Sequence, residues 1–219
     1  MTSAENIPER LVFINGRPMT LSAEPGKRIY GERLVCVSGE EYREWSPSRS
    51  KLSAYLCLGG LCFPFKKESN VLYLGAASGT TASHISDITV RGKIYCVECS
   101  QRTFRDLVNA CKDRMNMIPI LGDATSPESY SFAVGDVDVV YQDVAQREQA
   151  KILVDNMEHF SARYGMVSIK ARSEDVTANP KIIFERSCWY LEDSGMKILD
   201  IMSLEPYEMS HSMIIVERR

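Results

Sequence analysis

The sequence has no long hydrophobic segment. The longest apolar run in the first thirty residues is Leu11–Ile14, so we expect no signal peptide. No stretch approaches the roughly 18 apolar residues that a transmembrane helix needs. We therefore predict a cytoplasmic protein that has no membrane partner.

Cysteine and histidine are too scattered to predict a metal centre. Among seven cysteines, Cys96 and Cys99 have C-x-x-C spacing, but no second pair or nearby histidine completes a zinc site. Both belong to an apolar run over residues 93–99 that is typical of a buried strand, so we expect reduced, structural thiols. Trp45 and Trp189 are expected to be packing groups rather than platforms for base stacking.

Two common nucleotide-binding motifs are also absent. The chain has no G-K-[ST], which excludes a P-loop, and no G-x-G-x-x-G, which disfavours an NAD-dependent dehydrogenase. Its net charge is −3, whereas a protein that binds RNA alone is usually basic, because neutralising phosphates drives affinity. If RNA is the substrate, we expect the chain to depend on partners for binding it.

The first 50 residues have a β-rich pattern with several turns. Asn15-Gly16 indicates a hairpin, and short strands are expected at residues 28–30 and 33–37, ending at Ser38-Gly39-Glu40. We predict a small β-rich domain over residues 1–50 and a second domain over residues 51–219.

In the second domain, apolar strand-like runs alternate with helical segments. The expected strands are residues 71–74, 94–97, 117–120, 137–141 and 166–169, and the expected helices are 52–58, 78–87, 101–114, 146–160 and 180–191. This alternation predicts an α/β fold with a parallel sheet covered on both faces. Residues 197–203 and 212–216 are expected to form a final hairpin, with an antiparallel strand at the end of the sheet.

A glycine loop and three strand-end acids predict a nucleotide site. The loop Gly75–Thr81 joins the first strand to a helix, and Glu98, Asp123 and Asp143 follow the next three strands. In open α/β sheets, ligands bind beyond the carboxyl ends of the strands. An acid at the position of Glu98 suits a ribose diol, and one at Asp123 suits an adenine amino group. The alternative is that these acids only solvate the strand ends.

Several of these segments together resemble fibrillarin. They are Val71–Thr81, Asp143-Val-Ala-Gln146, Ser168-Ile-Lys170-Ala, Leu204–Glu208 and the entry segment Tyr42–Leu52. The resemblance runs from about residue 10 to the C-terminus. It is to the short archaeal form, since the Gly/Arg-rich tail of nucleolar fibrillarins is missing.

The resemblance implies a class I, Rossmann-like methyltransferase with a seven-stranded, mostly parallel sheet and S-adenosyl-L-methionine as methyl donor. The residues that it implies for cofactor binding are Gly75, Ala76, Thr80, Thr81, Glu98, Asp123, Ala124, Asp143 and Gln146. Glu98 would bind the ribose, Asp123 and Ala124 the adenine, and Asp143 with Gln146 the methionine end. No metal is expected.

Methylation of a ribose 2′-hydroxyl requires alignment of the oxygen and removal of its proton. A lysine can act as the base when burial or a neighbouring cation lowers its pKa. Lys51 and Lys170 each lie beside an apolar run. The family resemblance implies Lys51, Asp143, Lys170 and His211 as the catalytic set, with Lys170 as the base. Fibrillarins often have an acid just before this histidine, where this chain has Ser210.

The implied function is 2′-O-methylation of rRNA and tRNA at nucleotides chosen by a box C/D guide RNA. The implied partners are that guide RNA, a Nop-domain scaffold protein and a kink-turn-binding protein. Two alternatives stay open: a protein (glutamine) methyltransferase, and a non-catalytic subunit that binds the cofactor.

Overall fold

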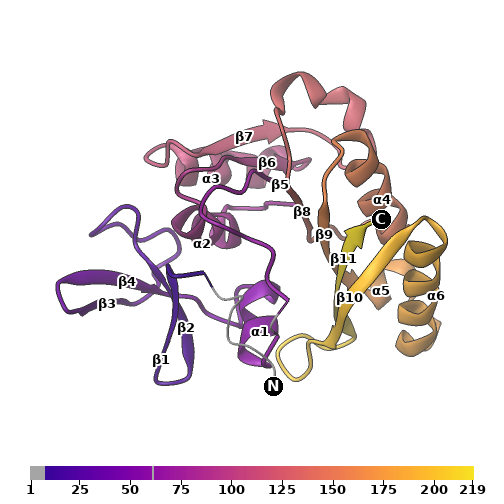
Figure 1. Cartoon of the computed structure of the whole chain (residues 1–219), viewed down its shortest axis with the longest axis horizontal. Coiled ribbons are helices and arrows are strands. Elements are labelled where there is room, and N and C mark those ends of the chain that lie inside the picture. The colour runs from indigo at the N-terminus through magenta and orange to yellow at the C-terminus, as the bar shows by residue number, and fades with distance from the viewer. Residues whose placement is uncertain (1–7, 61) are drawn as a thin grey trace.

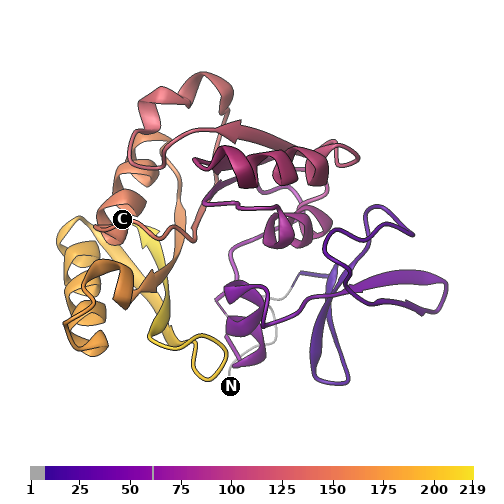
Figure 2. The ribbon, with the colours of Figure 1, turned by 180° about the vertical axis from the view of Figure 1, so that it is seen from behind.

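The computed structural model describes residues 8–60 and 62–219, which form two separate β-sheets. Figures 1 and 2 show the smaller, N-terminal sheet lying beside α1 and α2, on one side of the larger α/β unit. The proposed division into residues 1–50 and 51–219 includes residues 1–7, which lie outside the described part. The last strand of the first sheet ends at Glu44, and α1 begins at Lys51.

The N-terminal sheet is antiparallel, with the strand order β1-β2-β4-β3. Its strands are β1 Leu11–Ile14, β2 Arg17–Leu21, β3 Leu34–Val37 and β4 Glu40–Glu44. Two-residue turns with positive φ at both positions, Asn15-Gly16 and Ser38-Gly39, join the two hairpins, as the twist of neighbouring strands requires.

One expectation for this region was wrong. Residues 28–30 form no strand, because the buried Glu32 carboxylate accepts hydrogen bonds from the backbone N–H groups of Ile29 and Tyr30. Ser38-Gly39 ends β3, as expected, and turns the chain into β4.

The larger sheet has seven strands in the order β10-β11-β9-β8-β5-β6-β7. They are β5 Val71–Leu74, β6 Ile94–Glu98, β7 Met117–Leu121, β8 Val139–Gln142, β9 Tyr164–Lys170, β10 Met196–Ser203 and β11 His211–Arg218. Strands β5 to β9 are mutually parallel, and β11 is antiparallel to both of its neighbours. The antiparallel strand β11 therefore lies between β9 and the edge strand β10, and not at the end of the sheet as expected.

Helices cover both faces of this sheet, as the alternating pattern predicted. One face packs against α1 Lys51–Cys57, α2 Thr80–Ile88 and α3 Gln101–Cys111, and the other against α4 Gln149–His159 and α6 Pro180–Asp193. Alternate residues of one strand enter the two cores, so Val71 and Tyr73 face the first, and Leu72 and Leu74 the second. The short helices α5 Ala171–Glu174, η1 Pro127–Ser129 and η2 Ser131–Ala133 complete the described elements.

A buried ionic cluster joins the N-terminal sheet to α2. Arg43 on β4 bonds the carboxylates of Glu32 and Asp87, and Arg114 bonds the other oxygen of Asp87. Beside this cluster, the Trp45 ring stacks on His84 with centroids 4.8 Å apart. Trp45 is thus a packing group, as predicted, but Trp189 on α6 is 65% exposed, so that part of the expectation was wrong.

The cysteines are all free thiols. Cys96 is buried in β6, whereas Cys99 lies just beyond the strand and is exposed, contrary to the expectation of a buried pair. No helix among residues 8–60 and 62–219 is long and apolar enough to span a membrane.

Candidate active site

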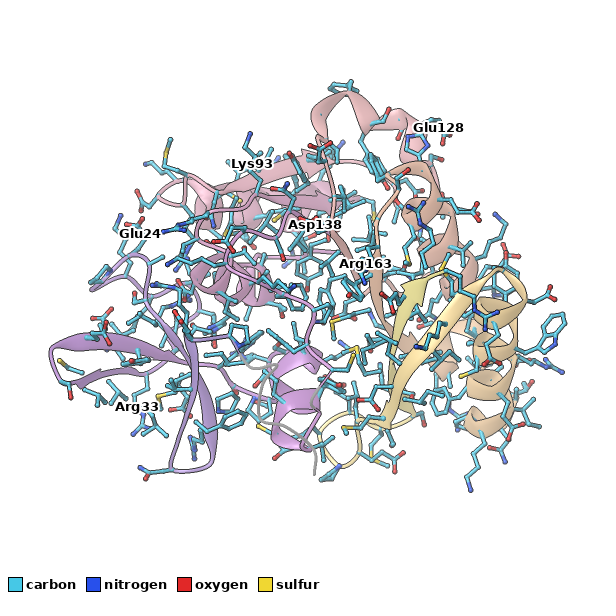
Figure 3. All side chains as sticks on the ribbon, viewed as in Figure 1. Glu24, Arg33, Lys93, Glu128, Asp138 and Arg163 are labelled. Atoms are coloured by element: carbon cyan, nitrogen blue, oxygen red, sulfur yellow. The ribbon has the colours of Figure 1, made fainter. Side chains whose placement is uncertain are left out.

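The candidate site lies at the carboxyl edge of the larger sheet, between β5 and β8. The chain moves outward from β5 to β6 and β7, and then returns to place β8 on the other side of β5. Connections therefore diverge at this point and leave a crevice, which is where open α/β sheets bind ligands. At the opposite edge, Figure 3 labels Lys93, Asp138 and Arg163, which directly precede β6, β8 and β9.

Gly75 is required where these two strands end. Its φ is +79°, and a Cβ atom there would lie 2.8 Å from the carbonyl oxygen of Asp143. A side chain would force the β5 and β8 ends apart. The neighbouring N–H groups of Gly75 and Ala76 both donate to the carbonyl of Val97, which fixes the loop to β6.

Glu98 forms one wall of the crevice. It is buried at the end of β6, and its carboxylate accepts hydrogen bonds from the N–H of Ala77 at 2.9 Å and of Ser100 at 2.8 Å. Ala77 has a left-handed conformation with φ +48°, which helps to turn its N–H toward Glu98. Carboxylate oxygens have further lone pairs, so Glu98 can still accept hydrogen bonds from a ligand.

The crevice encloses about 320 Å³. Six of the predicted residues line it: Gly75, Glu98, Ala124, Asp143, Gln146 and Lys170. Sequence reasoning missed six others, namely Ala77, Val97, Cys99, Gly122, Val144 and Ala145. These residues are apolar or small and directly adjoin predicted ones. Ala77, Val144 and Ala145 also lie within segments that carry the family resemblance.

Asp123 lies at the rim and not among the lining residues. Its carboxylate accepts hydrogen bonds from the Gln146 amide at 2.9 Å and from the N–H and hydroxyl of Thr125. The bond from Gln146, followed by those from Thr125, lowers the pKa of Asp123. Asp123 and Gln146 are thereby linked across the end of the crevice.

Three further residues predicted to bind a cofactor are not among the residues that line the crevice. Ala76 is buried in the core, Thr80 begins α2, and Thr81 is buried with its hydroxyl 2.9 Å from that of Ser50. Ser50 is the N-cap of α1 and directly precedes Lys51. Thr81 therefore helps to hold the start of α1 against α2, and thus the position of Lys51.

The structure brings Lys51, Asp143 and Lys170 together, although they come from three distant segments. The Lys51 amine lies 3.2 Å from one carboxylate oxygen of Asp143, and the Lys170 amine lies 2.8 Å from the other. Lys170 also donates to the Asp143 backbone carbonyl at 3.0 Å. All three side chains are 15–17% exposed, so they are mostly enclosed yet still reach solvent.

The remaining members of this cluster come from β11 and the loop before it. His211 is the register partner of Lys170, so the two side chains lie on the same face of the sheet. The Nδ1 atom of His211 donates to the carbonyl oxygen of Met209 at 2.8 Å, so Nε2 is the nitrogen that can accept a hydrogen bond in the neutral ring. Glu208, which the sequence analysis did not single out, lies 3.9 Å from the Lys51 amine.

Two buried tyrosines lie beneath Asp143. The rings of Tyr73 and Tyr141 meet edge to face, 4.7 Å apart. Burial, followed by the negative charge of Asp143, raises the pKa of Tyr73, which therefore stays neutral. The floor under the carboxylate is formed by buried aromatic rings, and a surrounding of low polarity strengthens ion pairs.

The arrangement offers two adjoining chemical environments. The crevice has small residues, one carboxylate wall and an apolar lining, and it ends at two amines held by a shared carboxylate. Within the part of the chain that the structure describes, no group of three His, Cys, Asp or Glu side chains is placed to hold a metal ion. The ionisable groups gathered at this end of the crevice are the two amines, Asp143 and His211.

Comparisons with known proteins identify the family. The fibrillarin family model matches residues 11–219. The fibrillarin-like rRNA/tRNA 2′-O-methyltransferase of Methanopyrus kandleri is 49% identical over 211 residues, covering 94% of this chain and 91% of its own.

Two solved structures are similar throughout. Aeropyrum pernix fibrillarin, with natively bound S-adenosyl-L-methionine, is 49% identical with a TM-score of 0.83, covering 91% of this chain and 88% of its own. A fibrillarin in complex with Nop5p is 39% identical with a TM-score of 0.89, covering 98% and 100%. The larger sheet is accordingly that of a class I methyltransferase, and the chain belongs to the fibrillarin family.

Proposed function

We propose that this chain transfers a methyl group from S-adenosyl-L-methionine to ribose 2′-hydroxyls of rRNA and tRNA. The observation that carries the proposal is the pair of lysine amines on Asp143, at the mouth of a crevice suited to an adenosine moiety. A cofactor-binding scaffold without activity has no use for such a pair. The Methanopyrus kandleri relative has this activity in its name, and the Aeropyrum pernix relative binds the same methyl donor.

The residues present fit the methyl donor. Gly75 and the small residues beside it line the crevice, and Glu98 offers carboxylate oxygens to a ribose diol. Asp123 and Ala124 would meet the adenine, and Asp143 with Gln146 the amino-acid end. Ala76, Thr80 and Thr81, in the same glycine loop and at the start of α2, would complete the cofactor site. When bound, S-adenosyl-L-methionine supplies an electrophilic methyl group on a sulfonium.

Lys170 is the proposed base. In its neutral form, the amine would accept the proton of the 2′-hydroxyl while the oxygen forms a bond to the methyl carbon and the sulfur–carbon bond breaks; the resulting ammonium would pair with Asp143. Lys51 and Asp143 would hold the ribose and keep the charge balanced, because Asp143 contacts both amines. His211, whose Nε2 is free to accept a hydrogen bond, would support the hydroxyl from the β11 side.

The choice of nucleotide is assigned to partners. With a net charge of −3, the chain is poorly suited to bind RNA alone. A box C/D guide RNA would select the target by base pairing, a Nop-domain protein would carry the methyltransferase, and a kink-turn-binding protein would anchor the RNA. The similar fibrillarin in complex with Nop5p supports the second of these. Since the relatives are archaeal, we also place the protein in the cytoplasm.

The test is methyl transfer from labelled S-adenosyl-L-methionine to a guide-matched RNA, with the chain alone and in the assembled particle. Label at a single ribose, found only with the particle, is the expected result. Absence of label on RNA, despite confirmed donor binding and particle assembly, would contradict the proposal. Label on a protein in the same reaction would instead support a protein methyltransferase.

The proposed donor site has its own test in Glu98→Ala. Losing charge-assisted hydrogen bonds to a ribose costs about 1.5–3 kcal/mol, so the affinity for S-adenosyl-L-methionine should fall about 10-fold or more in calorimetry. Glu128→Ala, which removes an exposed carboxylate from η1, is the matched control. Equal affinities for Glu98→Ala and the wild type would remove Glu98 from the site.

A further inference from the structure

Lys170 lies beyond the point where its neighbouring strand ends. The last paired residues of β8 and β9 are Gln142 and Val167, and β9 then continues for three residues to Lys170. The other flank of β9 is still covered by β11. On the β8 side, the backbone N–H and C=O of Lys170 therefore need partners that the sheet does not supply.

The side chain of Gln149 supplies both. Its Oε1 accepts a hydrogen bond from the Lys170 N–H at 2.9 Å, and its Nε2 donates to the Lys170 carbonyl at 3.2 Å. An amide side chain has the donor and acceptor of a peptide group, so Gln149 replaces one residue of a missing strand. It is fully buried, 0% exposed, where hydrogen bonds are hardest to exchange with water.

Gln149 is in turn held at the start of α4. Glu148, the N-cap of this helix, has φ +58° and makes no side-chain capping bond. The carboxylate of Glu174 caps the helix instead, accepting from the N–H groups of Glu148 at 2.9 Å and Gln149 at 2.7 Å. Because Glu174 belongs to α5, which directly follows Lys170, the contacts close a ring that runs from Lys170 through α5 and Gln149 back to Lys170.

We propose that Gln149 is a positioning residue, which sets the backbone of Lys170 and thereby the place of its amine against Asp143. The inference rests on the proposed function, in which Lys170 is the base. The amine makes two contacts with Asp143, of 2.8 and 3.0 Å, and small displacements of a catalytic group are costly: a shift of about 1 Å can cost about 100-fold in rate.

The first test is Gln149→Leu, which keeps a side chain of similar size and removes both hydrogen bonds to Lys170. In the assembled particle, kcat for RNA methylation should fall about 10- to 100-fold, while the affinity for S-adenosyl-L-methionine and the KM for RNA stay within about twofold. Gln149→Glu is closer in shape to the wild type; it keeps the acceptor and loses the donor, so its kcat should also fall. This second variant replaces Gln149→Leu if the latter folds poorly.

The control is Asn116→Leu, which removes an amide that bonds the backbone carbonyls of Ser86 and Thr89, away from the crevice. Asn116→Leu should lower stability and leave kcat unchanged. A structural role and a positioning role for Gln149 are separated by adding Gln149→Leu to Lys170→Ala. If Gln149 acts through Lys170, the second change has no further effect on kcat.

The outcomes are distinguishable. Two results would overturn the positioning role while the proposed function stands. One is a wild-type kcat for both Gln149 variants; the other is an equal fold-loss in kcat when Gln149→Leu is made in the wild type and in Lys170→Ala. A wild-type particle that binds the methyl donor and leaves RNA unlabelled would overturn both. A fall in kcat that disappears in the Lys170→Ala background supports the inference.

Discussion

Two aspartates in this molecule are each held between two basic side chains, but in different surroundings. Asp87 lies between Arg43 at 2.6 Å and Arg114 at 2.8 Å, and all three side chains are at most 2% exposed. Asp143 lies between Lys51 and Lys170, and these side chains are 15–17% exposed beside a crevice. The two clusters have the same formal charges, but the cluster around Asp87 is closed to solvent and the cluster around Asp143 is partly open to it.

The difference separates a structural cluster from a reactive one. Asp87 is fully used, because Thr20 and the N–H of Ala23 bond its carboxylate in addition to the two guanidinium groups. Arginine stays charged and presents several fixed donors, which suits a permanent buried junction between the N-terminal sheet and α2. Lysine amines can rotate and exchange protons, which suits a site that must meet a substrate.

The largest effect is expected for Asp87→Ala. Removing this carboxylate takes away the acidic partner of Arg114 and leaves Arg43 with Glu32 alone, and breaking a buried ion pair costs about 3–5 kcal/mol. The free energy of unfolding, measured by equilibrium chemical denaturation, should fall by that amount. Asp193→Ala, at the exposed end of α6, should change it by less than about 0.5 kcal/mol.

Binding of S-adenosyl-L-methionine sharpens this test. Protein that remains folded after Asp87→Ala should keep its affinity, since Asp87 is not among the residues lining the crevice. A loss below about 1 kcal/mol in unfolding free energy would show that the buried cluster is not the main connection between the N-terminal sheet and the larger α/β unit.

The next largest effect is expected for Lys170→Arg. The substitution keeps the positive charge beside Asp143 but removes a group that can lose a proton. If Lys170 is the base, methyl transfer in the assembled particle should fall at least about 100-fold, or about 2.7 kcal/mol. Unfolding free energy and affinity for the methyl donor should change little. Substantial turnover by Lys170→Arg would mean that the amine only supplies charge.

Local sequence patterns predicted the features that depend on neighbouring residues. The strand-end positions of Glu98, Asp143 and Lys170 follow from apolar runs that each end in a charged residue, and the structure places all three at the crevice. The parallel order of the central strands follows from alternating strands and helices. Their roles in binding and catalysis stay predictions.

Features that depend on distant partners could not be predicted in this way. The place of β11 between β9 and β10 is a choice among pairings that no local pattern records. The Glu32 carboxylate replaces strand pairing at residues 28–30, and the Gln149 amide replaces a strand beside Lys170. In each case one polar side chain satisfies backbone groups, and composition does not reveal which backbone it will reach.

The smallest effect concerns His84, which lies beside the Asp87 cluster. Thr20 and Tyr30 hydrogen-bond its two ring nitrogens. Burial, followed by the charges of Arg43 and Arg114, lowers the pKa of His84 well below 6.5. Below about pH 6.5, His84 therefore binds a proton in the unfolded chain but not in the folded chain. The contribution of His84 to stability is complete above this pH and decreases below it. The slope should be at most about 1.4 kcal/mol per pH unit.

Denaturation of the wild type and of His84→Gln between pH 7.5 and pH 5.5 measures this contribution. The variant is expected to be less stable throughout but to have a flatter pH dependence, since its amide does not titrate. His159→Gln, which replaces an exposed histidine at the end of α4, should keep the wild-type slope. Equal slopes for the wild type and His84→Gln would mean that the cluster around Asp87 tolerates a third cation, and that its charges are less tightly balanced than its hydrogen bonds indicate.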